Sequence, residues 1–361
     1  MAKIAVAMSG GVDSSTAAFI LKEQGHDIIG ITMRLWKDNE DKTRPGGCCS
    51  FRDIYDAKKV CNYLGIKHYV FNMEKEFKKI VVDNFVKEYL NGKTPNPCIV
   101  CNEKIKFDLL LKKAGALGFD YLSTGHYAEI ERKRTSGEIQ YYLKKGKDKE
   151  KEQTYFLYRL GQSELSKLKF PLGSLTKKEV RKIALKNKIP VAEKAESQEI
   201  CFVKNKYADF IKSYVPENNE KVKPGPIVDK KGKISGTHKG IIYYTIGQRS
   251  GLGISSKVPL YVIEIDASKN VIKIGEKKDV FSNKMIVSDV CWISGMAPKL
   301  PLKCKAKVRR QHPAAQAEIT AKKGELFIRF EKPQYAITGG QSAVFYERDY
   351  VLGGGIIEKA L

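Results

Sequence analysis

Along the first two hundred residues, short apolar runs take turns with segments in which apolar residues recur at helical spacing. Short, mostly apolar runs predict strands buried on both faces of a sheet, at residues 3–8, 27–36, 67–73 and 120–125. Between them, apolar residues recur at helical spacing and each such segment ends at a glycine, over residues 14–25, 51–65, 74–92 and 102–118. This alternation predicts an α/β fold in which helices cover both faces of a parallel sheet.

The pattern changes after about residue 201, where turns and strands replace most of the helical spacing. We expect one short helix at 206–215, then a connection rich in Pro, Gly and Lys with about one strand at 216–240. Residues 241–248 are β-like, and 259–266 with 271–276 predict a hairpin. From Phe281 onward, regularly spaced turns between short strands predict a small closed β-barrel or sandwich, and we favour the barrel.

The chain of 361 residues is too long for one ordinary domain. The change of pattern suggests three. We expect an α/β domain over residues 1–203, a small central domain over 204–278 and a C-terminal β-barrel over 279–361.

Cationic side chains outnumber acidic ones by 65 to 41, which gives a formal net charge of +24. This excess favours a polyanionic partner, because each phosphate that a protein neutralises releases condensed counterions. A lysine-rich, merely solvated surface is the alternative. The chain shows neither a signal-peptide pattern nor a run of about 20 apolar residues. We therefore expect a cytosolic protein that does not bind membranes.

The segment "AVAMSGGVDSS" connects the first predicted strand to the first predicted helix. Ser9, Gly10 and Gly11 permit a tight turn with exposed backbone N–H groups, and a helix N-terminus favours an anion. Asp13 fits a phosphate site if it holds Mg²⁺. The loop lacks both the Gly-Lys-Ser/Thr ending of a Walker A motif and the G-x-G-x-x-G pattern of dinucleotide folds.

SGGVDSS resembles the pyrophosphate-loop signature of the N-type ATP pyrophosphatases, which cleave ATP between its α and β phosphates. Six further stretches follow in the order of one family, the tRNA-specific 2-thiouridylases: "TPNPCIVCNEKIKF", "STGHYA", "EQTYFLYRL", "ESQEICFV", "YYTIGQRSGLGI" and "GGQSAVFY". The resemblance spans nearly the whole chain. It implies that residues 1–203 form an ATP-pyrophosphatase domain that uses ATP and Mg²⁺. It also implies the following nucleotide contacts: Ala7, Met8, Ser9, Gly10, Gly11, Val12, Asp13, Ser14, Met33 and Gly125.

The resemblance implies a chemistry in two steps, in which ATP first adenylates the C2 carbonyl oxygen of the wobble uridine. A sulfur atom carried as a persulfide on Cys201 then replaces that oxygen, with Cys101 as the partner cysteine. Either Cys101 releases sulfide from the persulfide, or the terminal sulfur attacks the base directly. Both routes require thiolates.

The resemblance also implies a tRNA partner, with the Lys, Glu and Gln tRNAs as the expected set. A sulfur-donor protein fed by a cysteine desulfurase would supply the persulfide. Asn96, Pro97 and Cys98 would line the site of the target base, which must leave its stack. Further tRNA contacts are implied at His126, Lys151, Glu152, Gln153, Arg309, Arg310 and Gln341.

The pair Cys98-x-x-Cys101 leaves other readings open. Zinc usually needs two such pairs, and a redox dithiol would need a thioredoxin-like context. An iron–sulfur cluster on Cys98, Cys101 and Cys201 is a possible alternative to a site without metal. Cys61, Cys291 and Cys304 are expected to be buried apolar residues. Another adenylating enzyme of the same loop family, or a non-catalytic RNA-binding protein, is the alternative function.

Overall fold

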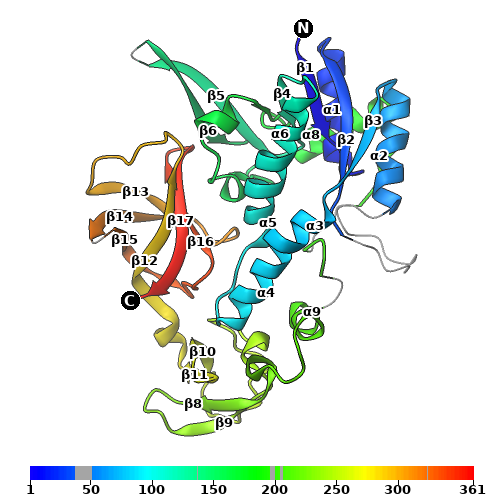
Figure 1. The fold of residues 1–361 in the computed structure, drawn as a ribbon. Coiled ribbons are helices and arrows are strands. Elements are labelled where there is room, and N and C mark those ends of the chain that lie inside the picture. Colours follow the sequence, from blue (N-terminus) through cyan, green and yellow to red (C-terminus); the bar gives the residue numbers. More distant parts are fainter. Residues whose placement is uncertain (37–50, 136, 196–199, 204–205, 323) are drawn as a thin grey trace.

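The computed structural model describes residues 1–361 except 37–50, 136, 196–199, 204–205 and 323 (Figure 1). The first part is built on one parallel sheet with the strand order β3-β2-β1-β4-β7. Its strands are β1 (Lys3–Ala7), β2 (Asp27–Arg34), β3 (His68–Asn72), β4 (Tyr121–Ser123) and β7 (Leu168–Lys169). The predicted parallel sheet is confirmed. The two-residue edge strand β7 was not predicted.

Helices cover both faces of this sheet, as predicted. On β1, Ile4 and Val6 pack into one core, while Ala5 between them packs into the other. The first core lies beneath α1 (Val12–Glu23) and α2 (Phe51–Leu64), and Ala184 of α8 (Lys177–Lys186) joins it. The second core, which we call the large core, is formed with the helices between residues 74 and 116. Alternation of side chains along a strand separates the two cores.

Two of the predicted helices contain wider, π-helical turns. The first consists of α3 (Glu74–Phe77), a π-helical turn at Lys78–Val82 and α4 (Asp83–Leu90). The second begins earlier than predicted, with α5 (Pro97–Val100), continues as a π-helix over Cys101–Leu110 and ends as α6 (Leu111–Ala116). Such π-helical segments are rare and are often found at functional sites. Cys101 is the first residue of the longer one.

The C-terminal part is a closed barrel, as predicted. Its strand order is β12-β15-β14-β13-β16-β17, and β17 pairs with β12 to close the ring. The strands are β12 (Phe281–Trp292), β13 (Leu302–Lys307), β14 (Ala315–Lys322), β15 (Glu325–Tyr335), β16 (Ser342–Glu347) and β17 (Tyr350–Ala360). Several are longer than the short strands that the sequence suggested.

A hairpin from the first part of the chain joins this barrel sheet. It consists of β5 (Ala128–Thr135) and β6 (Glu138–Lys145), and β6 pairs with β17 through Lys144 and Tyr350 (Figure 1). This hairpin was not predicted from the sequence. Short segments follow it, at Thr154–Phe156, α7 (Gln162–Leu165) and α8. The hairpin thus links the parallel-sheet part to the barrel.

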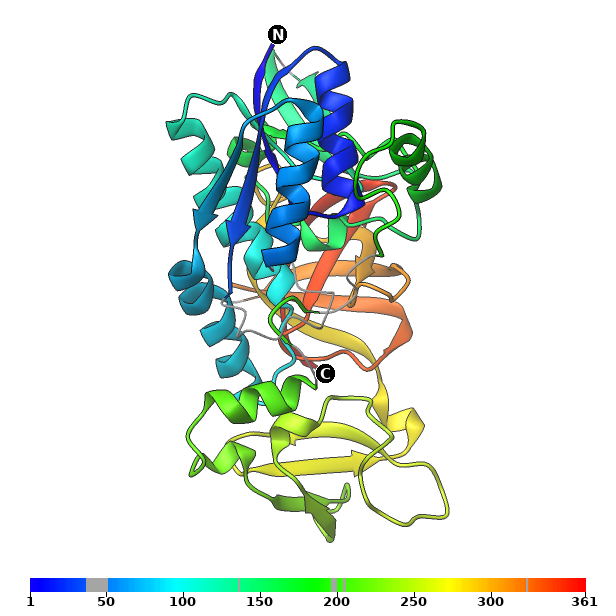
Figure 2. The ribbon, with the colours of Figure 1, turned by 90° about the vertical axis from the view of Figure 1, so that its right-hand side faces the viewer.

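The central part contains α9 (Tyr207–Tyr214) and a four-stranded sheet with the order β10-β11-β8-β9 (Figure 2). The predicted hairpin is confirmed as β10 (Tyr261–Asp266) and β11 (Val271–Gly275). The connection over 216–240 holds two strands rather than one, β8 (Gly225–Val228) and β9 (Ile234–His238). Short 3-10 turns lie at Glu220–Val222 and Lys277–Val280.

The prediction of β structure at residues 241–248 is wrong, because a 3-10 turn forms at Ile241–Tyr243. Gly240 before it has a φ of +127° and a Cβ there would lie 2.7 Å from the carbonyl oxygen of Val222. Ile241 and Ile242 are buried in different clusters. An apolar run can therefore be buried on two sides without being a strand. In the described part of the chain, no helix is long and apolar enough to cross a membrane.

Candidate functional site

The loop between β1 and α1 lies at the carboxyl end of the parallel sheet. Gly10 has a φ of +69°, and a Cβ there would lie 2.3 Å from the carbonyl oxygen of Asp53, so only glycine fits. Gly11 occupies the N-cap position of α1, where it has no side chain to cover the first N–H groups. Unpaired N–H groups and the helix dipole make this end of α1 suited to phosphate.

Serine hydroxyls fix the shape of this phosphate loop. The Oγ of Ser14 accepts from the backbone N–H of Ser9 at 3.1 Å and donates to the carbonyl oxygen of Gly11 at 3.2 Å. The Oγ of Ser15 donates to the same carbonyl at 2.8 Å. Both serine side chains are buried. The loop is therefore held in place by its own residues.

Asp13 does not stand alone in the loop. Its Oδ1 accepts from the Lys177 ammonium at 2.6 Å and from the Tyr127 hydroxyl at 2.8 Å. Lys177 lies on α8 and adds a positive charge beside the phosphate loop. Neither partner was predicted from the sequence, since each lies more than 100 residues from Asp13 and in no recognisable motif.

Lys194 connects the loop to α2. Its ammonium donates to the carbonyl oxygen of Gly10 at 3.0 Å, to Asp53 at 2.7 Å and to Asp56 at 2.6 Å. Burial lowers the pKa of Lys194, but its hydrogen bonds to the two carboxylates outweigh this and leave that pKa raised. Lys194 is therefore a cation that ties Gly10 of the phosphate loop to α2. It was not predicted from the sequence.

The two outlying nucleotide candidates lie in different surroundings. A Cβ on Gly125 would lie 2.8 Å from the backbone of Asp13 and Ser14, so this residue packs directly on the first turn of α1. Met33 lies on β2 and is buried in the large core. Gly125 is thus brought to the loop, while Met33 faces the side of the sheet that holds Cys101.

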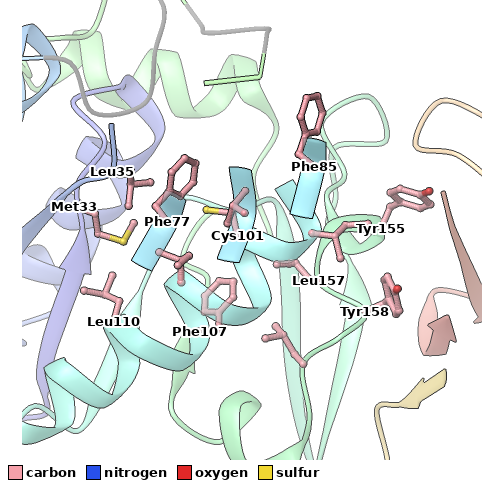
Figure 3. Close-up of a cluster of buried hydrophobic side chains, with 14 of the residues drawn as sticks. Met33, Leu35, Phe77, Phe85, Cys101, Phe107, Leu110, Tyr155, Leu157 and Tyr158 are labelled. Carbon is pink, nitrogen blue, oxygen red and sulfur yellow. The ribbon is translucent and has the colours of Figure 1, made fainter. Parts of the chain in front are cut away.

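The segment with the two nearby cysteines begins α5. The Asn96 side chain accepts from the N–H of Cys98 at 3.2 Å and caps the helix, and Pro97 is its first residue. Cys98 is exposed, whereas Cys101 is buried in the large core, where Figure 3 shows it with Phe77, Phe107 and other apolar side chains. The two cysteines therefore occupy unlike environments.

Cys201 is half-buried and packs against the same large core. Its neighbour Phe202 anchors it there, because the Phe202 ring lies 5.3 Å from that of Phe85 and 5.7 Å from that of Phe77, between ring centroids. The structure thus brings Cys101 and Cys201 to one core. The preceding residues 196–199, which belong to the "ESQEICFV" stretch, lie outside the described residues, as do Cys48 and Cys49.

The described residues include no group of three or more Cys, His, Asp or Glu side chains placed to hold a metal ion. A magnesium ion that arrives with ATP needs only one or two protein carboxylates. Asp13 fits that requirement, since Lys177 and Tyr127 both bind its Oδ1 and not its second oxygen.

Gln341 joins the barrel to the cysteine segment. Its Nε2 donates to the carbonyl oxygen of Thr94 at 2.7 Å, and the N–H of Thr94 donates to the carbonyl oxygen of Gly339 at 2.8 Å. Arg309 supports the same barrel loop, since its guanidinium donates to Ala336 and, at 2.7 Å, to the Thr338 hydroxyl. These residues therefore hold the barrel against the target-base candidates Asn96, Pro97 and Cys98.

Arg310 differs from Arg309. It is exposed, and its guanidinium carbon lies 5.4 Å from the centroid of the Phe156 ring. Asn102, next to Cys101, donates to the carbonyl oxygen of Phe156 at 3.2 Å. Arg310 thus reaches the region beside the cysteine segment and presents a positive charge there.

The remaining candidate tRNA contacts also form hydrogen bonds within the protein. Gln153 accepts from the N–H of Tyr127 at 2.9 Å, and Glu152 accepts from the N–H of Thr154 at 2.5 Å. The backbone N–H of Lys151 donates to Asp148 at 3.1 Å. His126 is within 2.6 Å of the Thr124 hydroxyl. Burial, and then the Lys106 charge, holds the pKa of His126 well below its usual range.

The chain is similar to known protein families in each of its three parts. It matches three family models, described as tRNA methyl transferase HUP domain over residues 2–205, tRNA methyl transferase PRC-barrel domain over 208–276 and aminomethyltransferase beta-barrel domain over 282–357. A solved U34-tRNA thiolase NcsA from Methanococcus maripaludis covers 60% of this chain and 69% of its own, at 19% identity and a TM-score of 0.35. A likeness this weak carries no conclusion.

Two curated relatives are similar along almost their whole length. The tRNA-specific 2-thiouridylase MnmA of Clostridioides difficile is 48% identical over 362 residues, covering 99% of each chain. The tRNA-specific 2-thiouridylase MnmA 1 of Thermoanaerobacter pseudethanolicus is 48% identical over 361 residues, covering 99% of this chain and 98% of the relative. At this identity and coverage, the chain belongs to the family of the tRNA-specific 2-thiouridylases.

Proposed function

We propose that this protein is a tRNA 2-thiouridylase that adenylates the C2 oxygen of the wobble uridine with ATP and then replaces that oxygen with sulfur. One observation carries the proposal. A phosphate loop and the pair Cys101 and Cys201 belong to the same parallel-sheet part, in a chain similar from end to end to proteins named for this activity. The relatives' names support the reaction, and the geometry supports the division of roles.

The first step uses the phosphate loop. The pyrophosphate part of ATP binds the N–H groups at the start of α1, with Met33 at the adenine and Gly125 allowing close approach. The uridine O2 attacks the α-phosphorus, the bond to the bridging oxygen breaks and pyrophosphate leaves. Lys177 lies beside the loop and offsets the negative charge that develops. A magnesium ion bound with ATP would use the second oxygen of Asp13 and neutralise phosphate charge.

The second step uses the two cysteines. The persulfide on Cys201 contributes one sulfur atom, and AMP leaves from C2 with the former carbonyl oxygen. In one route Cys101 attacks the Cys201 sulfur, so that a disulfide forms and the released sulfide attacks C2. In the other route the terminal sulfur attacks C2 first, and Cys101 then breaks the S–S bond to the base. Both routes leave a Cys101–Cys201 disulfide that a reductant must open.

The target base enters between α5 and the barrel. Asn96, Pro97 and Cys98 lie at the start of α5, where Gln341 and Gly339 bring the barrel loop into contact. Arg310 and Lys151 provide charge for phosphates, while Arg309, Gln341, Glu152, Gln153 and His126 position the segments that carry these contacts. A uridine reaches this site only if it leaves its stack.

The partners follow from this chemistry. The polyanionic substrate is tRNA, with the Lys, Glu and Gln tRNAs as the proposed set, and it matches the net charge of +24. A sulfur-donor protein that a cysteine desulfurase supplies loads Cys201. We place the reaction in the cytoplasm.

The proposal can be tested in the host cell. The gene is deleted, and wobble nucleosides of the purified tRNAs are measured by mass spectrometry. We expect 2-thiouridine derivatives to disappear, to return with the wild-type gene and to stay absent with Cys201→Ser. Normal 2-thiouridine after deletion, in a strain without a second copy of the enzyme, would overturn the proposed function.

A further inference from the structure

A cavity lies beside the hairpin, outside the site described above. It has a volume of about 300 Å³ and is bounded by β5 and β6, by the end of β12 and the segment that follows it, by the end of β16 and by the start of β17. Its lining includes Lys133, Gln140, Tyr142, Trp292, Glu347 and Tyr350. None of these residues belongs to the phosphate loop, the cysteine segment or the implied tRNA contacts.

The aromatic side chains of this hairpin cavity are held in a fixed arrangement. The rings of Tyr142 and Tyr350 meet edge to face, with centroids 5.9 Å apart. The Tyr350 hydroxyl donates to Glu131 at 2.6 Å, and the Trp292 ring lies 5.7 Å from that of Phe345 in the barrel. Rings that are already ordered lose little entropy when a flat ligand packs against them.

Lys133 shows that the faces of these rings attract positive and polar groups. Its ammonium lies 4.7 Å from the centroid of Tyr350 and 5.3 Å from that of Tyr142, and it is 3.0 Å from the Tyr350 hydroxyl. Gln140 accepts from the Tyr142 hydroxyl at 2.6 Å, and both residues line the cavity. The cavity thus offers aromatic faces together with hydrogen-bonding groups, which is how proteins bind unstacked nucleobases.

The charge around the cavity favours a base that belongs to a polyanion. Residues 128–145 of the hairpin carry five cationic and three acidic side chains, and the whole chain carries a net charge of +24. Arg132 and Arg134 lie on the same strand as Lys133 but on its opposite face, so they add charge to the hairpin and not to the cavity lining. A free aromatic molecule would gain little from these charges, whereas a base on a phosphate backbone would gain from both.

We propose that the hairpin cavity binds one unpaired nucleobase of the tRNA substrate, at a position other than the wobble uridine. The identification of the RNA as tRNA rests on the proposed function. β16 places the cavity relative to the target-base site, because it begins beside Gln341, which contacts the cysteine segment, and ends at Glu347 in the cavity lining. Six residues of strand span about 20 Å, so a second nucleotide must fill the cavity.

The test compares two tyrosines with the same local chemistry. Tyr142→Leu removes the aromatic face but keeps apolar volume. Tyr55→Leu on α2 is the matched control, because the Tyr55 ring is 59% exposed and has the Lys59 ammonium 4.6 Å from its centroid, but does not line the cavity. Binding of unmodified tRNA is measured by fluorescence anisotropy at fixed salt. We expect about tenfold weaker binding for Tyr142→Leu, in line with the loss of one stacked base, and no change for the control.

A second arm identifies the ligand group as a base. Single bases are removed from the unpaired positions of the tRNA, and each abasic tRNA is bound to wild type and to Tyr142→Leu. We expect one abasic position to weaken binding to wild type about tenfold and not to weaken binding to Tyr142→Leu any further. Equal affinity of Tyr142→Leu and wild type would overturn the proposal. So would an effect of Lys133→Gln on the salt slope without any sensitive base, since the contact would then be to phosphate.

The outcomes also separate this proposal from the proposed function. Tight tRNA binding that depends on Tyr142, in a protein that forms no 2-thiouridine, would contradict the reaction and support the cavity. Thiolation at normal KM by Tyr142→Leu would contradict the cavity and support the reaction.

Discussion

A few residues hold the phosphate loop in its shape. Some act through a close backbone contact that only glycine allows, and others act through their charge. Gly10 and Gly125 are glycines because other segments press against them, Asp53 in one case and the first turn of α1 in the other. Lys194 donates to the carbonyl oxygen of Gly10, and Lys177 donates to the Asp13 carboxylate. The loop therefore keeps its shape through contacts with α2, α8 and the segment after β4.

Gly125→Ala tests the close approach at the start of α1. The new methyl group would lie 2.8 Å from the backbone of Asp13 and Ser14, so that the loop must move. We expect a loss of about 1–3 kcal/mol of stability and weaker ATP binding, measured by chemical denaturation and by calorimetry. Gly115→Ala on α6 is the control, since nothing lies within 4 Å of its added Cβ, and it should stabilise by about 0.5–1 kcal/mol. Equal effects of the two substitutions would contradict this account.

His126 predicts a dependence of stability on acid pH. Burial and Lys106 hold the pKa of the folded-state imidazole well below 6.5, so below that pH the unfolded chain binds the proton more readily. The free energy of unfolding should therefore be fully retained above about pH 6.5 and fall on acidification, by at most about 1.4 kcal/mol per pH unit from this residue. Denaturation curves at pH 5 to 7.5 for wild type and His126→Asn measure the difference. An acid dependence that is the same in both proteins would exclude His126 as its source.

At the scale of residues, the sequence predicts features that are formed by neighbours along the chain. The tight turn at Ser9, Gly10 and Gly11 and the helix start beside Asp13 could be predicted because the residues that form them follow one another in the sequence. Lys177, Lys194 and Tyr127 could not, since only the folded sheet brings them to the loop. The same holds for Arg309, whose neighbours along the chain give no sign that its guanidinium binds carbonyl groups within the barrel.

At the scale of elements, the contact between the barrel loop and the start of α5 connects the two ends of the chain. Thr94 both donates to Gly339 and accepts from Gln341, and a Cβ on Gly340 would lie 2.9 Å from that of Lys93. The barrel is therefore packed directly against the segment that leads to Cys98 and Cys101. We propose that the barrel holds that segment in addition to contacting tRNA.

Gln341→Ala tests this role. Loss of one hydrogen bond to Thr94 should loosen the contact by about 1 kcal/mol, so that the thiolation rate constant at saturating tRNA falls about fivefold. Gln316→Ala, an exposed glutamine on β14 of the same barrel, serves as the control and should leave the rate unchanged. Single-turnover formation of 2-thiouridine is the measurement. If Gln341→Ala raised only KM, the residue would be a substrate contact instead.

The spacing of apolar residues predicted most helices and strands, but not the irregular turns within them. The helices over 74–92 and 102–118 were predicted by spacing, yet the π-helical turns within them were not, because a single wider turn hardly changes the pattern. The hairpin of β5 and β6 was missed because charged residues are mixed with apolar ones along both strands. The apolar segment 241–248 was wrongly predicted to be β structure, because burial on both sides is not specific to strands.

At the scale of the whole molecule, charge and topology act together. The net charge of +24 is spread over a chain in which the barrel, the hairpin and the cysteine segment are in contact. The three-part organisation was predictable from the change of pattern along the chain. The closed barrel was predicted too, but the pairing of β12 with β17 that closes it and the pairing of β6 with β17 were not, because the paired strands lie far apart in the sequence.

Two adjacent arginines test the use of this charge. Arg310 is exposed, and Arg310→Ala should flatten the slope of log K against log salt for tRNA binding by about one unit. Arg309 was predicted from the sequence to act in the same way. Its guanidinium instead binds Thr338 and Ala336, so Arg309→Met should lower stability and leave the slope nearly unchanged. Affinity measured over a series of salt concentrations decides, and equal slopes for both variants would contradict the distinction.

The central claim is that Cys101 and Cys201 act together on an adenylated uridine, and reconstituted thiolation of purified tRNA tests it most directly. Wild type, Cys98→Ser, Cys101→Ser and Cys201→Ser receive ATP, Mg²⁺, a persulfide donor and reductant, and both 2-thiouridine and pyrophosphate are measured. We predict thiolation by wild type and appreciable thiolation by Cys98→Ser. Cys101→Ser and Cys201→Ser should form no 2-thiouridine but still release pyrophosphate. Equal loss in all three variants, with iron and sulfide in anaerobically purified protein, would contradict the claim and make the three cysteines a cluster site.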